Sequence, residues 1–170
     1  RDLYAKDFPR GIPFKNFLIT DPVRQQIPWR KIVIDAWKNA KWPKYDPFTF
    51  AGVPLDANVQ AAPFYPLNIL FLIFDFPIAW TVLIMLQPLL AGWFLYLYLR
   101  TLKLSELSSF VGATSWAFGG FSIAWLTWGT MMQTALWLPL ILLAIDKNKP
   151  ILLGLAMIMT ILAGHLQIAV

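Results

Sequence analysis

The chain has 170 residues, the length of one domain, but 58% of them are hydrophobic and only 14% are charged. Soluble domains average about 45–50% apolar and about 25% charged residues, so the composition favours a membrane protein. The net charge of +5 does not come from a basic cluster interleaved with aromatic residues, which argues against a nucleic-acid partner. Because the sequence has no cysteine, disulfides, zinc–thiolate sites and cysteine nucleophiles are excluded.

Residues 1–66 form the first of two predicted regions and hold ten Lys/Arg and six Asp/Glu, too many charges for membrane insertion. Within them, apolar residues recur at helical spacing and predict an amphipathic helix that lies on the membrane surface or docks onto the spans. Its apolar face is predicted to be Trp29, Val33, Trp37 and Ala40, and its remaining surface Arg30, Lys31, Asp35, Lys38 and Lys41. The proline- and aromatic-rich stretch 43–66 predicts an ordered loop without long regular structure.

Residues 67–170 form the second region and predict about four transmembrane or re-entrant helices, so the expected fold is an all-α membrane protein. The apolar segments are 67–74, which is too short to cross a bilayer; 78–99, the clearest span; 108–128, with Gly119-Gly120 in its middle; 134–145, extended towards Thr130; and 150–170, interrupted at His165 and Gln167. Gly119-Gly120, together with Ser108, Gly112 and Ser115 at spacings of three or four residues, favours close helix packing over a break. Since the chain starts without methionine and ends in an apolar run, we expect it to be a piece of a longer protein.

Charge predicts the orientation of these helices in a cell membrane. The basic residues of the second region lie in two connections, Arg100 to Lys103 and Lys147 to Lys149. Two predicted spans separate the connections, so both are expected on one face, the cytoplasmic one. Residues 1–77, the 125–133 turn and His165 are then expected on the opposite, extracytoplasmic side. Four tryptophans would form an aromatic belt near that outer boundary: Trp80, Trp125, Trp128 and Trp137.

An ordered series of short motifs covers nearly the whole chain. It consists of Thr20-Asp21-Pro22-Val23, Pro28-Trp29, Ala36-Trp37-Lys38-Asn39, Trp42-Pro43, Asp46-Pro47, Phe50-Ala51-Gly52-Val53-Pro54-Leu55, Ala57-Asn58-Val59-Gln60, Phe64-Tyr65-Pro66-Leu67-Asn68, Gly119-Gly120-Phe121, Trp128-Gly129, Leu136-Trp137-Leu138-Pro139 and Ala163-Gly164-His165-Leu166-Gln167. The series resembles the bacterial YfhO-like membrane proteins, which are related to GT-C-type glycosyltransferases. Leu166 departs from it, since the family pattern has a proline between the histidine and the glutamine.

The resemblance implies transfer of a sugar from a polyprenyl-phosphate carrier to a cell-envelope glycan or polymer acceptor outside the membrane. An acidic residue early in the first outer loop serves this chemistry in GT-C enzymes, and Asp21 matches that position. A carboxylate can accept the proton of an attacking hydroxyl, while a cation, Arg24 or Arg30, or a divalent metal would stabilise the leaving phosphate. Further substrate-binding candidates on the outer side are Asn58, Gln60, Trp128, His165 and Gln167.

Several of these residues have a plainer interpretation. Asp21 precedes a proline and is also typical of a turn that starts a helix, and His165 could hydrogen-bond a neighbouring helix as a packing residue. The outer-loop aromatics are expected to anchor the loop more often than to stack on a sugar. Asp35, Asp46 and Asp56 are expected to be solvated or helix-capping. The alternatives for the whole chain are a transporter or lipid-handling protein, and a non-catalytic membrane scaffold.

Overall fold

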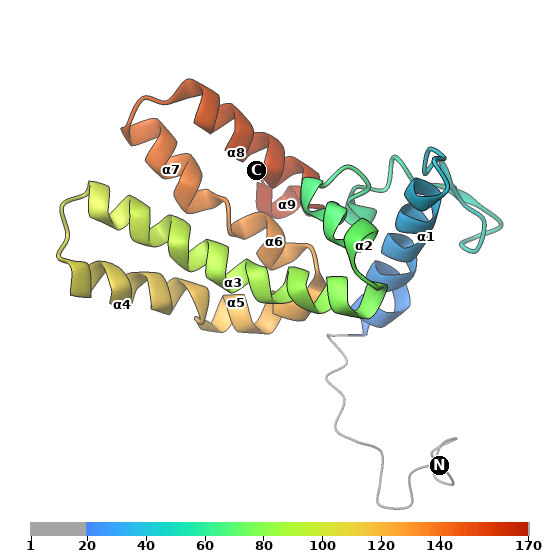
Figure 1. Cartoon of the computed structure of the whole chain (residues 1–170), viewed down its shortest axis with the longest axis horizontal. Coiled ribbons are helices and arrows are strands. Elements are labelled where there is room, and N and C mark those ends of the chain that lie inside the picture. Colours follow the sequence, from blue (N-terminus) through green and yellow to red (C-terminus); the bar gives the residue numbers. More distant parts are fainter. Residues whose placement is uncertain (1–19, 170) are drawn as a thin grey trace, which may run out of the picture.

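The computed structural model describes residues 20–169, and these residues are mostly helical (Figure 1). Of the predicted outer region, the first 19 residues lie outside the described residues. The main helices are α1 (Ile27–Lys38), α2 (Leu70–Ile73), α3 (Phe76–Thr101), α4 (Glu106–Ala117), α5 (Gly120–Trp125), α6 (Met131–Ala135), α7 (Leu138–Asp146), α8 (Pro150–Leu162) and α9 (Leu166–Ala169). The predicted all-α class is therefore confirmed.

The predicted amphipathic helix is α1, which a π-helical segment, η2 (Pro22–Gln26), precedes. It docks onto the rest of the molecule through Val33 and Ile34, which are buried. Arg30, predicted on the charged surface, is instead 0% exposed. Ala40, predicted on the apolar face, is exposed and lies beyond the helix with a left-handed φ of 51°. The buried face of α1 thus runs through Arg30, Val33 and Ile34, which share one side of the helix at spacings of three and four.

The stretch from Lys41 to Tyr65 is an ordered loop, as predicted, with a small hairpin and one short 3-10 turn. Strands β1 (Tyr45–Asp46) and β2 (Val53–Pro54) pair antiparallel, and η3 (Val59–Ala61) follows them. Asp46 was predicted to be solvated or helix-capping, but it is buried and holds the hairpin turn. Its carboxylate accepts hydrogen bonds from Phe48 N at 2.8 Å and Thr49 Oγ1 at 2.6 Å, which satisfies its oxygens away from water.

Helix α3 is the one helix within residues 20–169 that is long and apolar enough to cross a membrane. It confirms a continuous helix at the predicted segment 78–99 and extends it by two residues at each end. At 1.5 Å per residue, 26 residues extend about 39 Å, more than the ~30 Å of a bilayer's hydrocarbon core. Before it, the predicted short apolar segment forms η4 (Pro66–Ile69) and the one-turn helix α2, too short to cross.

The remaining apolar segments are interrupted or short. The segment 106–125 breaks between α4 and α5, where Gly119 has an extended backbone with φ of −65° and ψ of 166°. A Cβ at Gly119 would lie 2.5 Å from the Ser115 carbonyl oxygen, so this turn of the chain requires glycine. The predicted close packing is found at Gly112, where a Cβ would lie 2.7 Å from Leu99 Cδ1 of α3, while Gly119-Gly120 marks a break. The segment 131–146 breaks between α6 and α7, and the last segment between α8 and α9, at the predicted interruption around His165.

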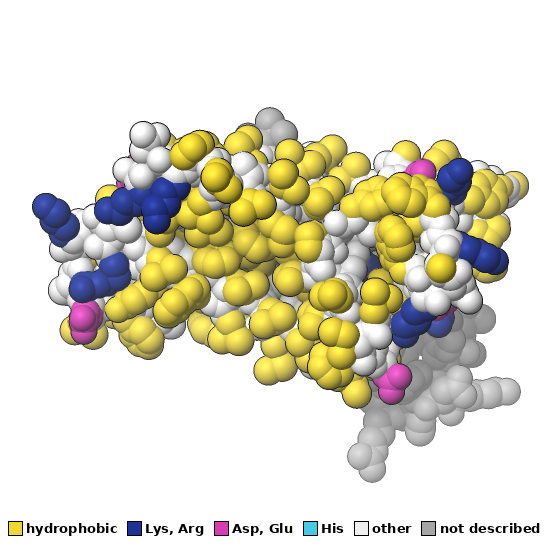
Figure 2. Space-filling model, turned by 45° about the horizontal axis from the view of Figure 1, so that its top comes forward, with side chains coloured by type: hydrophobic (Ala, Val, Ile, Leu, Met, Phe, Trp, Pro, Cys, Tyr) yellow, Lys and Arg dark blue, Asp and Glu magenta, His cyan; other side chains and the backbone are white. Residues whose placement is uncertain are grey.

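Two helical hairpins, α3–α4 and α7–α8, have their turns at the same end of the molecule (Figure 1). Those turns carry the two basic connections, and the unit formed by η2, α1 and the hairpin loop lies at the opposite end. On the face shown in Figure 2, charged side chains gather at the two ends and hydrophobic side chains cover the region between them. This face thus has an apolar middle and charged ends.

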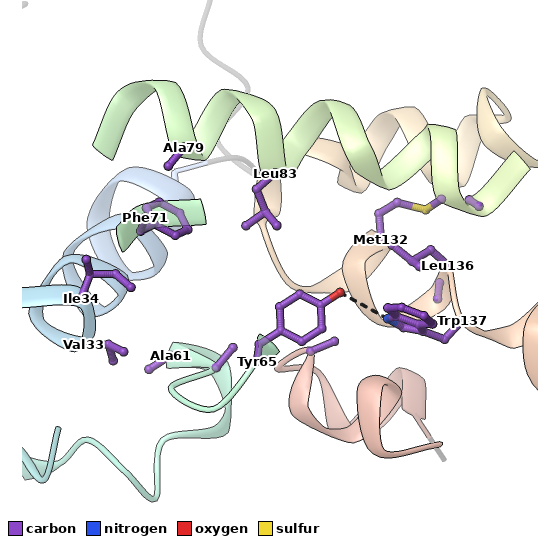
Figure 3. Close-up of a cluster of buried hydrophobic side chains, with 14 of the residues drawn as sticks. Val33, Ile34, Ala61, Tyr65, Phe71, Ala79, Leu83, Met132, Leu136 and Trp137 are labelled. Atoms are coloured by element: carbon purple, nitrogen blue, oxygen red, sulfur yellow. Dashed lines mark hydrogen bonds between the residues drawn. The ribbon is translucent and has the colours of Figure 1, made fainter. Parts of the chain in front are cut away.

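The main cluster of buried hydrophobic side chains lies where the N-terminal unit meets the helices (Figure 3). It joins Val33 and Ile34 of α1 to Phe71 of α2, Leu83 of α3 and Met132 of α6. Burying each such side chain contributes about 1.5–3 kcal/mol. The N-terminal unit is therefore packed onto the helices rather than tethered beside them.

Candidate functional site

Buried polar side chains gather at the end of the molecule opposite the basic turns. We call this set the polar cluster; it consists of Gln26, Arg30, Gln60, Asn68, Thr130, Gln133 and His165. All are buried except Gln60, which is half-buried. Burying a polar group without a hydrogen bond destabilises the fold, so each hydrogen bond in this cluster contributes to stability.

Arg30 connects three distant stretches of the chain. Its Nη1 donates to Asn68 Oδ1 at 2.5 Å, and its Nη2 lies 3.5 Å from the carbonyl oxygen of Gly129. Asn68 in turn donates from Nδ2 to the Ala62 carbonyl oxygen at 2.7 Å. Arg30 thereby ties α1 to η4 and to the turn before α6. This arrangement makes Arg30 a structural cross-link, and the substrate contact expected of it stays a prediction.

Burial sets the ionisation of the two titratable groups beside this cross-link. It lowers the pKa of the Arg30 guanidinium to about 10, which leaves the group charged at neutral pH. Burial also raises the pKa of the Tyr65 phenol, against weaker opposing effects of the Trp137 hydrogen bond and the Arg30 charge. Tyr65 Oη accepts from Trp137 Nε1 at 3.3 Å, as the dashed line in Figure 3 marks. The interior here thus holds one cation beside a neutral phenol.

The chain around His165 is held by Gln133. Gln133 Nε2 donates to the Ala163 carbonyl oxygen at 2.8 Å, at the point where α8 ends. Gly164 follows with φ of 106°, and a Cβ there would lie 3.0 Å from Thr130 Cγ2 and 3.1 Å from the Val59 carbonyl oxygen. Only glycine fits both this conformation and this contact. The break before α9 is therefore built against both α6 and the outer loop.

A small pocket of about 220 Å³ opens beside this break, and we call it the outer pocket. It is lined by Val59, Gln60, Gly164, His165, Leu166 and Gln167. Gln60 Oε1 accepts from Gln26 Nε2 at 3.0 Å, so the rim is fixed by the η2 segment. His165 is 7% exposed, and its Nδ1 has no hydrogen-bond partner among residues 20–169. The pocket thus offers two amides and one imidazole to a small polar ligand.

Three of the predicted site residues, Gln60, His165 and Gln167, come together in the outer pocket. Asn58 supports it indirectly, since its Oδ1 accepts from Gln60 N at 3.1 Å and starts η3. Trp128 ends η5 (Leu126–Trp128), which contacts η2, and its ring packs edge-on against Trp125 at 5.2 Å. Aromatic packing in the loop also joins Trp37, Trp42 and Phe64.

Asp21 and Arg24 lie at the η2 segment. Asp21 is half-buried and precedes Pro22 at the start of the helix, without a capping hydrogen bond from its side chain. Arg24 is exposed. Asp21 thus begins the segment that ends with Gln26, whose side chain holds the rim of the outer pocket. Asp35 and Asp56 are on the surface, where Asp35 pairs with Lys31 at 3.7 Å and Asp56 accepts from Trp42 Nε1 at 3.2 Å.

Sequence reasoning missed Gln26, Asn68, Thr130 and Gln133. Gln133 carried a usable signal, because an amide next to an apolar segment needs a partner that a membrane does not supply. The sequence around Asn68 and Gln26 gave no such signal, since their hydrogen-bond partners, Arg30 and Gln60, lie 38 and 34 residues away. For a divalent metal, no group of three His, Cys, Asp or Glu side chains comes together among the residues that the structure describes.

The chain was compared with protein-family models, with curated proteins and with solved structures. None of the three comparisons finds a match.

Proposed function

We propose that the chain belongs to a multi-pass membrane protein, with residues 67–169 in the bilayer and residues 20–66 on the extracytoplasmic side. Three observations support this placement. Helix α3 has the length and apolarity of a span. Large apolar side chains are exposed along the middle of the molecule, among them Leu89, Trp93 and Phe110. The charged side chains lie at its two ends, with both basic turns at one of them (Figure 2).

Within this placement we propose a glycosyltransferase-like activity of the GT-C type, as the resemblance to YfhO-like proteins implies. The substrate would be a polyprenyl-phosphate-linked sugar and the acceptor a hydroxyl of a cell-envelope glycan or polymer. The observation that carries the proposal is the outer pocket, where Gln60, His165 and Gln167 meet at the predicted outer end. Amides and an imidazole are suited to bind sugar hydroxyls, which both donate and accept hydrogen bonds.

Asp21 is the proposed base. Its carboxylate would take the proton of the acceptor hydroxyl as that oxygen bonds to the anomeric carbon. The bond from the anomeric carbon to the phosphate oxygen would break, and the polyprenyl phosphate would leave with the electron pair. Arg24, exposed on the same segment, is placed to offset the charge that develops on that phosphate. Arg30 would act indirectly, since its guanidinium is buried against Asn68 and Gly129.

The test is transfer of radiolabelled hexose from a polyprenyl-phosphate hexose by the full-length protein in detergent. We expect Asp21→Asn to lower transfer by at least about 100-fold, because the amide keeps the shape of the side chain but cannot accept the proton. Asp35→Asn is the matched control, since Asp35 is an exposed carboxylate on the neighbouring helix. Unchanged transfer by Asp21→Asn would refute the role of Asp21. Binding of the labelled lipid without transfer by either protein would favour lipid handling instead.

The membrane placement has its own test, which the lack of cysteine in these 170 residues simplifies. Single cysteines are introduced at Lys103 and Lys147 in the two basic turns, and at Phe48, which is 85% exposed in the outer loop. In intact cells, a membrane-impermeant maleimide is expected to label the cysteine at Phe48 and to spare the other two until the cells are opened. Labelling of the cysteine at Lys103 or Lys147 in intact cells would reverse the orientation and move the outer pocket inside.

A further inference from the structure

A groove of about 430 Å³ lies between α3 and α4 on the outside of the helices. The floor of the groove is formed by three small residues, Gly92, Ala113 and Ala117. Larger side chains would fill it, since a Cβ at Gly92 would already touch Ala117 Cβ at 3.3 Å. Trp93 and Phe110, 57% and 64% exposed, form its walls. The hydroxyl of Thr114 is bonded to the Phe110 carbonyl oxygen at 2.9 Å, so the groove is apolar for most of its length.

The length and depth of this groove match one acyl chain. Along α3 it extends from Pro88 to Tyr96, eight residues or about 12 Å at 1.5 Å per residue. One leaflet contributes about half of the ~30 Å hydrocarbon core, or about 15 Å. The groove occupies the half of α3 that leads to the α3–α4 turn. A chain lying in it would therefore belong to the leaflet on the side of that turn.

Positive charge lies where the headgroup of such a lipid would be. Arg100 follows Tyr96 by one helical turn, and Lys103 lies in the turn itself, where both are exposed. Arg100 Nη1 donates to the Leu104 carbonyl oxygen at 2.6 Å, and Nη2 approaches Glu106 Oε1 at 3.6 Å. Lys103 forms no ion pair within residues 20–169. The turn thus carries two cations and one carboxylate, and an anion would balance the excess.

We propose that the α3–α4 seam binds an anionic phospholipid, with one acyl chain in the groove and the phosphate at Arg100 and Lys103. A basic site between helices on the cytoplasmic side is the arrangement that attracts such lipids. This inference rests on the proposed membrane placement and is independent of sugar transfer. The occupant is a lipid rather than another protein segment because the apolar groove continues directly into a cationic end, as the two halves of a phospholipid require.

The test is native mass spectrometry of the full-length protein, titrated with dioleoyl phosphatidylglycerol or dioleoyl phosphatidylcholine. The two lipids share their acyl chains and differ in headgroup charge. We expect the first molecule of phosphatidylglycerol to bind more tightly than the first molecule of phosphatidylcholine. Replacing both Arg100→Gln and Lys103→Gln should weaken it by about 25-fold, taking roughly fivefold for each cation, and should weaken the zwitterionic phosphatidylcholine much less. Replacing both Lys147→Gln and Lys149→Gln, the same loss of two charges in the other basic turn, is the control and should cost less than about twofold.

Filling the groove tests the acyl-chain half of the site. Thr114→Trp adds a large ring from an exposed position on α4, and we expect it to weaken both lipids by at least about tenfold. Leu89→Trp, from the exposed side of α3, is the second such variant and should do the same. Equal affinity for both headgroups in the wild-type protein, or unchanged binding after both tryptophan substitutions, would overturn the proposal. So would dimers that Thr114→Trp disrupts while lipid binding persists, since a second copy would then occupy the groove.

Discussion

Helix α3 and the apolar segments packed around it satisfy their backbone groups in opposite ways. α3 is continuous over 26 residues, so its backbone groups bond to one another except at Pro88, which has no N–H to donate to the Ile84 carbonyl oxygen. The other segments are interrupted, and each interruption exposes carbonyl oxygens that need donors. At two of the interruptions side chains supply them: Ser122 Oγ donates to the Trp116 oxygen at 2.5 Å between α4 and α5, and Gln133 Nε2 to the Ala163 oxygen at 2.8 Å between α8 and α9.

This difference explains where the polar cluster is. Arg30 reaches the Gly129 oxygen in the turn before α6, and Asn68 reaches the Ala62 oxygen in the loop. The polar side chains are concentrated where the backbone is not helical, and the outer pocket forms at one of these places. A discontinuous helix can thus build a polar site that a continuous one cannot.

The strongest way to break this arrangement is to remove Arg30. Arg30→Ala leaves Asn68 Oδ1 and the Gly129 oxygen without a donor, in an interior that water does not reach. We expect a loss of about 3 kcal/mol in the free energy of unfolding. Arg24→Ala is the control, because Arg24 is exposed, and it should change stability by less than about 0.5 kcal/mol. Denaturant titration of the full-length protein in detergent measures both, and equal losses would contradict the cross-link.

The break before α9 is tested at its glycine. Gly164→Ala puts a Cβ on a residue with φ of 106° and within 3.1 Å of the Val59 oxygen, so we expect a loss of about 2 kcal/mol. Gly154→Ala is the matched change, since Gly154 lies in α8 with nothing within 4 Å of the new Cβ. It should be neutral or stabilising by up to about 1 kcal/mol. A lower melting temperature for Gly164→Ala than for Gly154→Ala would support a break that requires glycine at position 164. An unchanged melting temperature for Gly164→Ala would contradict it.

Two buried glutamines give the smallest and most direct comparison. Gln133 holds a carbonyl oxygen at an interruption, whereas the amide of Gln87 in continuous α3 has no hydrogen-bond partner within residues 20–169. We expect Gln133→Leu to cost about 1–2 kcal/mol and Gln87→Leu to gain about 1 kcal/mol, because the second change removes two unpaired polar atoms. Unfolding free energies of opposite sign are the expected outcome. A loss in both variants would assign Gln87 a partner elsewhere in the protein.

The sequence was a good guide where local pattern decides the structure. Unbroken apolarity predicted α3, helical spacing predicted α1, and the polar pair His165 and Gln167 marked the last interruption. It failed at Arg30, although Arg30 precedes Val33 and Ile34 by three and four residues and so shares their buried face. The charge suggested a surface position, and only Asn68 and Gly129, 38 and 99 residues away, stabilise it inside.

The candidate site likewise has one part that the sequence predicts and one part that it does not. The residues of the 163–167 motif could be placed together because they are neighbours in sequence. Gln60 joins them through the fold of a loop without repeating pattern, which local rules do not specify. Gly119-Gly120 was misinterpreted for a related reason: whether a glycine pair packs or breaks a helix depends on the neighbouring carbonyl, here that of Ser115.

Two side chains near the ends of α1 hold the loop that follows it. Gln26 bonds Gln60 at 3.0 Å, and Trp37 Nε1 donates to the Pro63 oxygen at 3.2 Å. These two bonds couple the loop to the helix. A partner that displaced α1 by binding its solvent-facing side, at Lys31 or Lys38, would therefore also displace Gln60 at the rim of the outer pocket without touching it.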